Sequence, residues 1–179
     1  MTDRKGESFS ASFAPPFSVR AALAADANAI VQLVESAYRG DSSRAGWTTE
    51  ADLLDGQRTD MEQVAGLLIN PAARILIART DRELLGSVLV EAETAGVAHI
   101  GMFAVRPSLQ GRGIGRALLE HAELLAREVF GAERAQMSVI EQRSDILAWY
   151  RRLGYRQTGA TEPFPYGNPR FGLPRRADL

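Results

Sequence analysis

The clearest candidate for chemistry in this sequence is a glycine-rich turn, VRPSLQGRGIGRALL (residues 105–119), between an expected strand and an expected helix. Such a turn points several free backbone N–H groups at one place, at the positive end of the helix dipole. A phosphate or pyrophosphate is the natural ligand of that arrangement. Gly113 and Gly115 let the backbone approach the ligand closely, and Arg112 and Arg116 add positive charge.

Three phosphate-binding patterns compete for this turn. A Walker A loop needs a lysine directly after its glycines, and none is present. A dinucleotide-binding GxGxxG needs a glycine where Arg116 stands, and it opens the first βαβ unit rather than lying past the middle of the chain. The remaining pattern, [RQ]xxGx[GA], is met by Gln110, Gly113 and Gly115.

Two neighbouring segments extend the pattern. The strand IGMFAVRP (residues 100–107) leads into the turn, and LAWYRRLGY (residues 147–155) is a helix with the ending Y-x-x-x-G-[FY]. In this order and separation, the segments resemble the GCN5-related N-acetyltransferase (GNAT) superfamily. The similarity is strong over residues 97–157, whereas residues before Arg74 match only in the order of their elements.

The resemblance implies an α/β (α+β mixed) fold, in which helices flank a central mixed, mostly antiparallel sheet and a splayed central strand forms the acyl-CoA cleft. Acetyl-CoA would be the co-substrate, and no metal is expected. The pantetheine arm would lie along the main chain of Phe103, Ala104 and Val105. The pyrophosphate would lie on the N–H groups that follow Gln110, which are those of Gly111, Arg112, Gly113, Ile114, Gly115 and Arg116.

Catalytic roles also follow from the resemblance. Tyr150 stands where the family commonly has a tyrosine that protonates the departing thiolate. His99 stands where several members place a base, and an imidazole accepts a proton near neutral pH. By the two-residue period of a strand, His99 should share one face with Gly101, Phe103 and Val105. Glu91 and Glu93 are the reserve for the base, and His121 is expected to serve packing or the surface.

The sequence departs from the family at Arg143, where an asparagine is frequent. Ser144 is therefore a candidate for contact with the cofactor, although it is equally suited to cap the following helix. For the acceptor, the resemblance points to the segment of residues 38–50. Tyr38 and Trp47 would form the wall of the pocket, and Glu50 would attract an ammonium group.

Three classes of function remain open at this stage. An N-acetyltransferase would act on a primary amine of a small molecule or peptide by direct attack in a ternary complex, because the chain has no cysteine to carry the acyl group. A non-catalytic acyl-CoA-binding sensor would have the same fold without turnover. A scaffold protein that does not bind CoA is a third, weaker reading.

Composition and charge argue against two other classes of protein, those that bind nucleic acid and those that span a membrane. The 179 residues are 45% hydrophobic and carry a net charge of −1, so no basic field favours binding to nucleic acid. The sequence has no run of about 20 apolar residues, so no membrane span is expected. We expect residues 1–16 to be a flexible tail, residues 17–179 to form a single domain, and the protein to be cytoplasmic. A homodimer is left open.

The period of the apolar residues places the elements. We expect a hairpin across Thr80 and Asp81, helices that begin near Asp26, Thr49 and Thr59, and no regular strand after Tyr166. Strands are expected at residues 17–21, 74–79, 83–90, 97–105 and 135–140, and later helices at residues 114–130 and 145–153.

Overall fold

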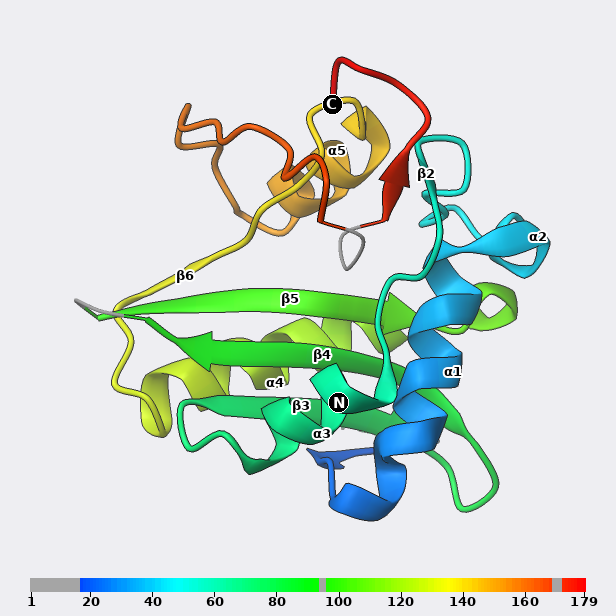
Figure 1. The fold of residues 1–179 in the computed structure, drawn as a ribbon. Helices are drawn as coiled ribbons and strands as arrows, with labels where there is room; N and C mark the ends of the chain where they lie inside the picture. Colours follow the sequence, from blue (N-terminus) through cyan, green and yellow to red (C-terminus); the bar gives the residue numbers. More distant parts are fainter. Residues whose placement is uncertain (1–16, 94–95, 169–171) are drawn as a thin grey trace, which may run out of the picture.

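A five-stranded sheet forms the centre of the computed structural model, which describes residues 17–93, 96–168 and 172–179 (Figure 1). Four strands are antiparallel to their neighbours, and the last is parallel to the fourth. The expected mixed, mostly antiparallel sheet is therefore confirmed. The expected tail of residues 1–16 lies outside the described residues. In spatial order the strands are β1 (Ser18–Ala21), β3 (Ala73–Arg79), β4 (Leu84–Ala92), β5 (Val97–Val105) and β6 (Arg134–Gln136).

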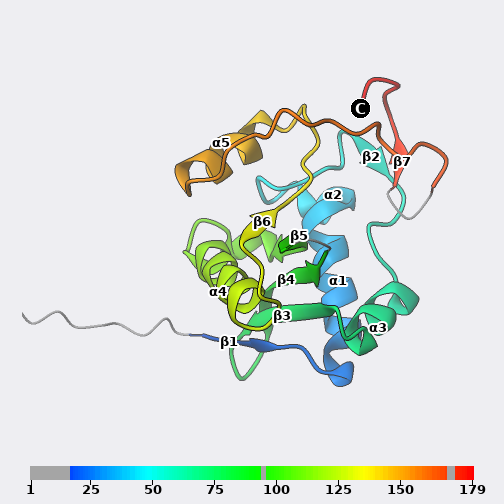
Figure 2. The same ribbon diagram turned by 90° about the vertical axis from the view of Figure 1, so that its left-hand side faces the viewer.

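Helices cover both faces of the sheet (Figure 2). One face packs on α1 and α3 through a core that includes Ile30, Val64 and Ile77. The other packs on α4 through a core that includes Val88 and Leu118. The helices are α1 (Ala27–Tyr38), α2 (Gly40–Ser43), α3 (Met61–Ile69), α4 (Ile114–Glu128) and α5 (Ser144–Arg152), with 3-10 turns η1 (Ala24–Asp26) and η2 (Pro107–Leu109).

A β-bulge interrupts β5 at Met102. Ser87 of β4 pairs with Ala104 and Leu89 pairs with Gly101, so two residues of β5 lie opposite Val88 alone. Met102 has a φ of 42°, a left-handed conformation that a side chain rarely adopts. The extra residue reverses the alternation of the side chains beyond it. The two-residue period assumes a regular strand, so it could not predict which face the residues after this bulge occupy.

β5 loses its second neighbour after the third of its nine residues. Its pairing with β6 covers only Val97 to His99, and it ends at the partner Gln136. The predicted strand of residues 135–140 is thus shorter than expected, and Figure 1 shows the chain after β6 rising away from the sheet toward α5. The second half of β5 therefore has an open edge, as a splayed central strand requires.

Of the predictions for individual turns, helices and strands, some are confirmed and others are wrong. The hairpin at Thr80 is confirmed, since its amide donates to Glu83 across the turn. The helix predicted from Thr49 is absent: turns fill residues 51–53, and the short strand β2 (Leu54–Asp55) follows. Helix α3 forms, but its N-cap is Asp60 rather than Thr59, because the Asp60 carboxylate accepts from the amide of Gln63. Among the described residues after Tyr166, the strand β7 (Leu173–Pro174) pairs with β2 instead of joining the main sheet.

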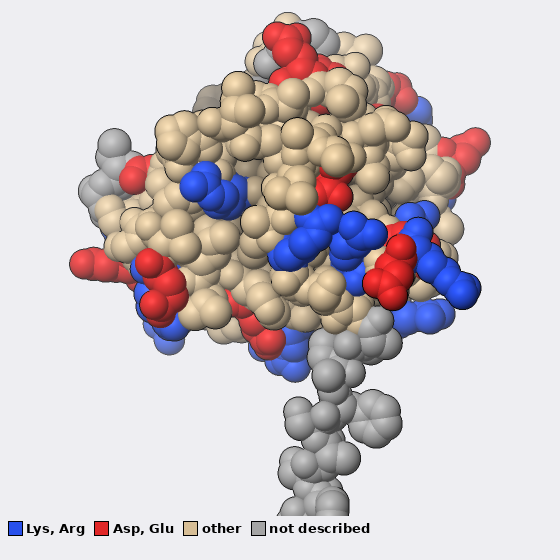
Figure 3. All heavy atoms as spheres, turned by 90° about the horizontal axis from the view of Figure 1, so that it is seen from below, with Lys and Arg blue, Asp and Glu red and all other residues tan. Residues whose placement is uncertain are grey.

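Charges of both signs are interspersed on the face drawn in Figure 3. Within the described residues, no helix is long and apolar enough to cross a membrane. The same residues contain no group of His, Asp or Glu side chains arranged to hold a metal ion.

Close contact between β4 and α4 generates the first prediction. A Cβ atom on Gly86 would lie 2.7 Å from Leu118 Cδ1 and 2.9 Å from the carbonyl oxygen of Ala104. We expect Gly86→Ala to lower the free energy of unfolding by about 1–3 kcal/mol through overpacking. The matched control is Gly66→Ala in α3, where a Cβ meets nothing within 4 Å and the helix should gain about 0.5–1 kcal/mol. Urea unfolding followed by circular dichroism gives both values, and equal stabilities would contradict the packing argument.

Candidate active site

The N-terminus of α4 presents a set of unpaired amides. In the described part of the chain, no backbone carbonyl accepts from the amides of residues 111–116, and the first bond of the helix runs from Ala117 to Gly113 at 3.0 Å. Gly111 and Gly113 have φ values of 78° and 82°, and a Cβ on either would meet nothing within 4 Å. Open space therefore lies over a row of N–H donors at the positive end of a helix. This arrangement fits a pyrophosphate.

The open edge of β5 runs directly into this turn. The amide of Arg106 donates to Leu85 of β4, so the alternation of a strand turns the backbone of Val105 to the open edge and that of Ala104 to β4. The Val105 carbonyl accepts from Gln110 Nε2 at 3.2 Å. The Phe103 carbonyl accepts from the Tyr38 hydroxyl at 2.5 Å. Side chains thus hold the carbonyls of two of the three residues whose main chain was expected to meet the pantetheine arm.

Tyr150 of α5 belongs to a row of aromatic rings that extends to Phe103 of β5. Its ring centroid is 5.0 Å from that of Trp149 and 5.6 Å from that of Tyr155. The Trp149 ring lies 5.9 Å from Phe103 of β5. Burial raises the pKa of Tyr150, the nearby Tyr38 raises it further, and Arg143 opposes both. The hydroxyl of Tyr150 is therefore protonated at neutral pH, which an acid requires.

His99 lies apart from this group. Its neighbours Ala98 and Ile100 face the α4 core, so His99 faces the side of α1 and α3, where its Cε1 atom lies 3.4 Å from the Cβ position of Gly101. Phe103 and Val105, beyond the bulge, pack on the α4 side. The predicted common face is therefore wrong, because Met102 reverses the alternation. Four residues, or roughly 13 Å of strand, separate His99 from Phe103.

Comparison with known proteins identifies the family. The model of the acetyltransferase (GNAT) family matches residues 29–155. The chain belongs to this family. It is 28% identical over 136 residues to a peptidyl-lysine N-acetyltransferase, YjaB, of Salmonella typhimurium, an alignment that covers 73% of this chain and 86% of the relative. Membership in the GNAT family makes the protein an acyltransferase.

Solved structures agree on the GNAT fold. The aminoglycoside acetyltransferase meta-AAC0020, from an uncultured soil metagenomic sample, superposes with a TM-score of 0.64 at 17% identity, over 84% of this chain and 95% of that one. A ribosomal-protein-alanine N-acetyltransferase of Brucella melitensis gives 0.61 at 18% identity, over 84% and 99%. At these identities the likeness concerns the fold alone.

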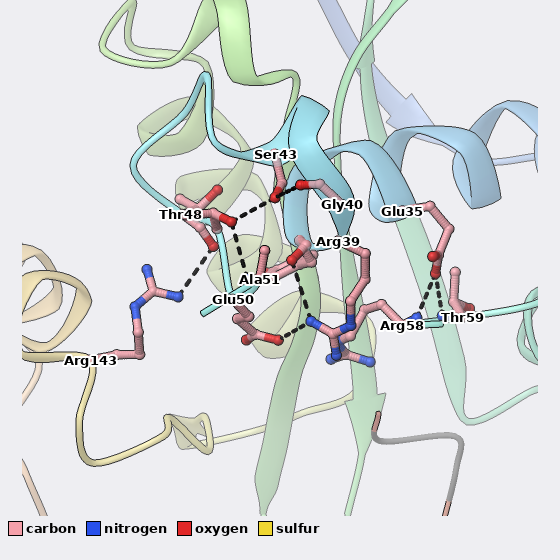
Figure 4. Close-up of polar contacts among 12 residues, drawn as sticks. Glu35, Arg39, Gly40, Ser43, Thr48, Glu50, Ala51, Arg58, Thr59 and Arg143 are labelled. Atoms are coloured by element: carbon pink, nitrogen blue, oxygen red, sulfur yellow. Dashed lines mark hydrogen bonds and ion pairs between the residues drawn. The ribbon is translucent and has the colours of Figure 1, made fainter. Parts of the chain in front are cut away.

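Two residues predicted to bind the acceptor have other partners in this GNAT protein. Tyr38 is 8% exposed, and burial, with a further contribution from Glu50, raises its pKa to about 12. Its hydroxyl fixes the bulged strand rather than lining a pocket. Glu50 pairs with the buried Arg39, Oε2 to Nη1 at 2.7 Å, so its charge is directed inward (Figure 4). Trp47 is 41% exposed and can still meet a ligand.

Sequence reasoning missed the importance of Arg143. This residue is 8% exposed, and its guanidinium bonds both carboxylate oxygens of Asp145 and the carbonyl of Trp47. It also bonds the carbonyl of Thr48, as Figure 4 shows. The Arg-x-Asp spacing at the start of α5 is the sequence signal that could have indicated the pairing of Arg143 with Asp145. Arg143, and not Ser144, is the N-cap of α5: Ser144 is the first residue of the helix, so its predicted capping role is wrong.

The glycine turn of the GNAT cleft generates the second prediction. We expect Gly113→Glu to abolish binding of acetyl-CoA, because it sets a carboxylate over the amides that should hold the pyrophosphate. Gly131→Glu is the matched control: its φ of 63° imposes a similar backbone strain, nothing lies within 4 Å of its Cβ position, and it follows the opposite end of α4. Titration calorimetry measures both. Binding by Gly113→Glu at the wild-type affinity would contradict this site.

Proposed function

We propose that this protein transfers an acetyl group from acetyl-CoA to a primary amine of a peptide or small molecule by direct attack in a ternary complex. The supporting observation is the adjacency of three features: the free amides before α4, the open edge of β5, and the protonated Tyr150 on α5. The relative named as a peptidyl-lysine N-acetyltransferase favours an amine carried on a peptide.

The donor would extend along two elements. The amides of residues 111–116 and the guanidinium of Arg112 would hold the pyrophosphate, and the amide of Val105 would meet the pantetheine arm. Acetyl-CoA supplies an activated acyl carbon and a sulfur leaving group. Tyr38 would act here by fixing the Phe103 carbonyl, which holds the bulge of β5 in one conformation.

The reaction forms one bond and breaks one. The neutral amine attacks the thioester carbonyl, the new C–N bond forms, and the C–S bond breaks as the tetrahedral intermediate collapses. The attacking nitrogen releases one proton to solvent as it becomes the amide. Tyr150 gives its proton to the departing sulfur and recovers one from solvent. The chain contains no cysteine, so an acyl-cysteine intermediate has no site.

The amine must also lose a proton. His99 faces the α1 side of β5, at the end where β6 still pairs. Because the bulge and roughly 13 Å of strand lie between His99 and Phe103, we place His99 as a base that acts through water rather than by contact. Glu91, its partner across β4 and β5, is the reserve.

The acid role of Tyr150 generates the third prediction. Tyr150→Phe should lower kcat by about 100-fold, the usual contribution of a positioned acid, with little change in the KM for acetyl-CoA. Tyr155→Phe is the control, since the Tyr155 hydroxyl is bonded to Glu123 at 2.5 Å and faces away from the cleft. Release of free CoA, followed with a thiol reagent, measures both. A near-normal kcat for Tyr150→Phe would remove the role.

The pH profile tests the same role independently. A tyrosine whose pKa is raised by burial keeps its proton above pH ~10, the ordinary value for tyrosine. We expect wild-type kcat to show no alkaline decline below that pH. A decline centred near pH 9 would assign the acid to another group.

The base generates the fourth prediction. His99→Ala should lower kcat/KM by about tenfold or more at pH 7, with a smaller loss at pH 9, where more of the amine is already neutral. His121→Ala is the control, because His121 lies exposed on α4 with Nδ1 2.7 Å from the Ala117 carbonyl oxygen. If both variants behave alike, Glu91→Gln becomes the next candidate. Binding of acetyl-CoA without turnover of any amine would instead favour the sensor.

A further inference from the structure

A short segment, residues 46–48, connects the turn before α4 with the start of α5, and we call it the strap. On one side it is tied to the cofactor turn through a single side chain. Gln110 Oε1 accepts from the amide of Trp47 at 2.8 Å, while Gln110 Nε2 donates to Thr48 Oγ1 at 2.7 Å. A Cβ on Gly46 would lie 2.7 Å from the same Gln110 amide, so the packing is close.

On the other side the strap is tied to the start of α5. Arg143 Nη2 donates to the Trp47 carbonyl at 3.1 Å, and Nη1 donates to the Thr48 carbonyl at 3.2 Å. Nε and Nη2 also donate to the two carboxylate oxygens of Asp145, each at 3.1 Å. One buried guanidinium thereby joins two carbonyls of the strap to the first turn of the helix that carries Tyr150. A planar fork of this kind tolerates little displacement.

Aromatic contacts reinforce the bridge. The ring of Trp47 lies 6.1 Å from that of Trp149, which in turn lies 5.9 Å from Phe103. A Cβ on Gly115, in the first turn of α4, would lie 3.7 Å from Trp149. The strap therefore contacts the cofactor turn and α5, and Trp149 of α5 connects it indirectly to Phe103 of β5.

We propose that Arg143 is a positioning residue that holds the strap against α5, so that the strap presents the acceptor amine to the reacting centre beside Tyr150. The inference rests on the proposed function and adds a residue that acts through the strap. Gln110 leads into the amides of residues 111–116, so a ligand that fixes this turn also fixes one end of the strap.

Loss of Arg143 frees one end of the strap and leaves the donor site in place. Binding of acetyl-CoA should then be nearly unchanged, while the acceptor loses its support. A residue needed only for folding would instead weaken both sites together.

The test uses Arg143→Met, which keeps the length of the side chain and removes every donor. Arg20→Met is the matched control, because Arg20 also bonds both carboxylate oxygens of an aspartate, Asp26, at 2.8 and 3.0 Å, but in β1 and η1. Hydrogen exchange followed by mass spectrometry, with and without CoA, measures the strap and needs no acceptor. We expect strap amides to exchange about tenfold faster in Arg143→Met, with residues 111–116 still protected by CoA, and Arg20→Met to match wild type in both segments.

Kinetics provide the second readout, with a blocked peptide containing one central lysine as the acceptor probe. Arg143→Met should raise the KM for this peptide about tenfold, with the Kd for acetyl-CoA changed less than threefold. Arg143→Lys should recover only part of the loss, because an ammonium cannot reproduce the fork. Strap exchange and peptide KM equal to wild type would overturn the inference and leave the proposed function standing. Failure of the wild-type protein to bind CoA would remove the proposed function and the inference with it.

Discussion

The arrangement of β5, the glycine turn and α5 depends on a mismatch of one residue between β4 and β5. β5 carries one residue more than β4 across the bulge at Met102, and the φ of 42° there is a strained conformation for a side chain. Tyr38, at the end of α1, donates its buried hydroxyl to the next carbonyl along, that of Phe103. Helix packing and strand register thus fix the same peptide. The aromatic contact to α5 and the exit into the glycine turn both begin at this point.

Residues before and after the bulge accordingly differ in environment. Before it, the strand is flanked on both edges, and His99 faces α1 and α3. After it, the strand is flanked on one edge only, and Phe103 and Val105 face α4. The acid and base proposed for the reaction therefore belong to different faces of one sheet.

The sequence predicted well those features that depend on local patterns. Glycines at 111 and 113 have the positive φ values that a tight turn into a helix needs, and the strands and helices from residue 73 to 128 lie within a few residues of their expected bounds. Failures came where contacts made only in the folded chain decide the local structure. Thr49 has the spacing of a helix cap, yet its hydroxyl bonds Ser43, so the segment is held as a turn. The partner of Glu50 and the bonds from Arg143 to Trp47 and Thr48 are likewise set by tertiary structure, whereas the Arg-x-Asp spacing does indicate the pairing of Arg143 with Asp145.

Gln110 shows what a choice between two residues at one motif position can decide. The pattern [RQ]xxGx[GA] allows arginine or glutamine there, and both can donate to the Val105 carbonyl. A guanidinium, however, has no acceptor atom. An arginine at this position would leave the Trp47 amide without its partner, so the phosphate-binding turn would survive while its tie to the strap would be cut. A glutamine at this position can therefore hold the glycine turn through the Val105 carbonyl and, at the same time, bond the strap through the Trp47 amide.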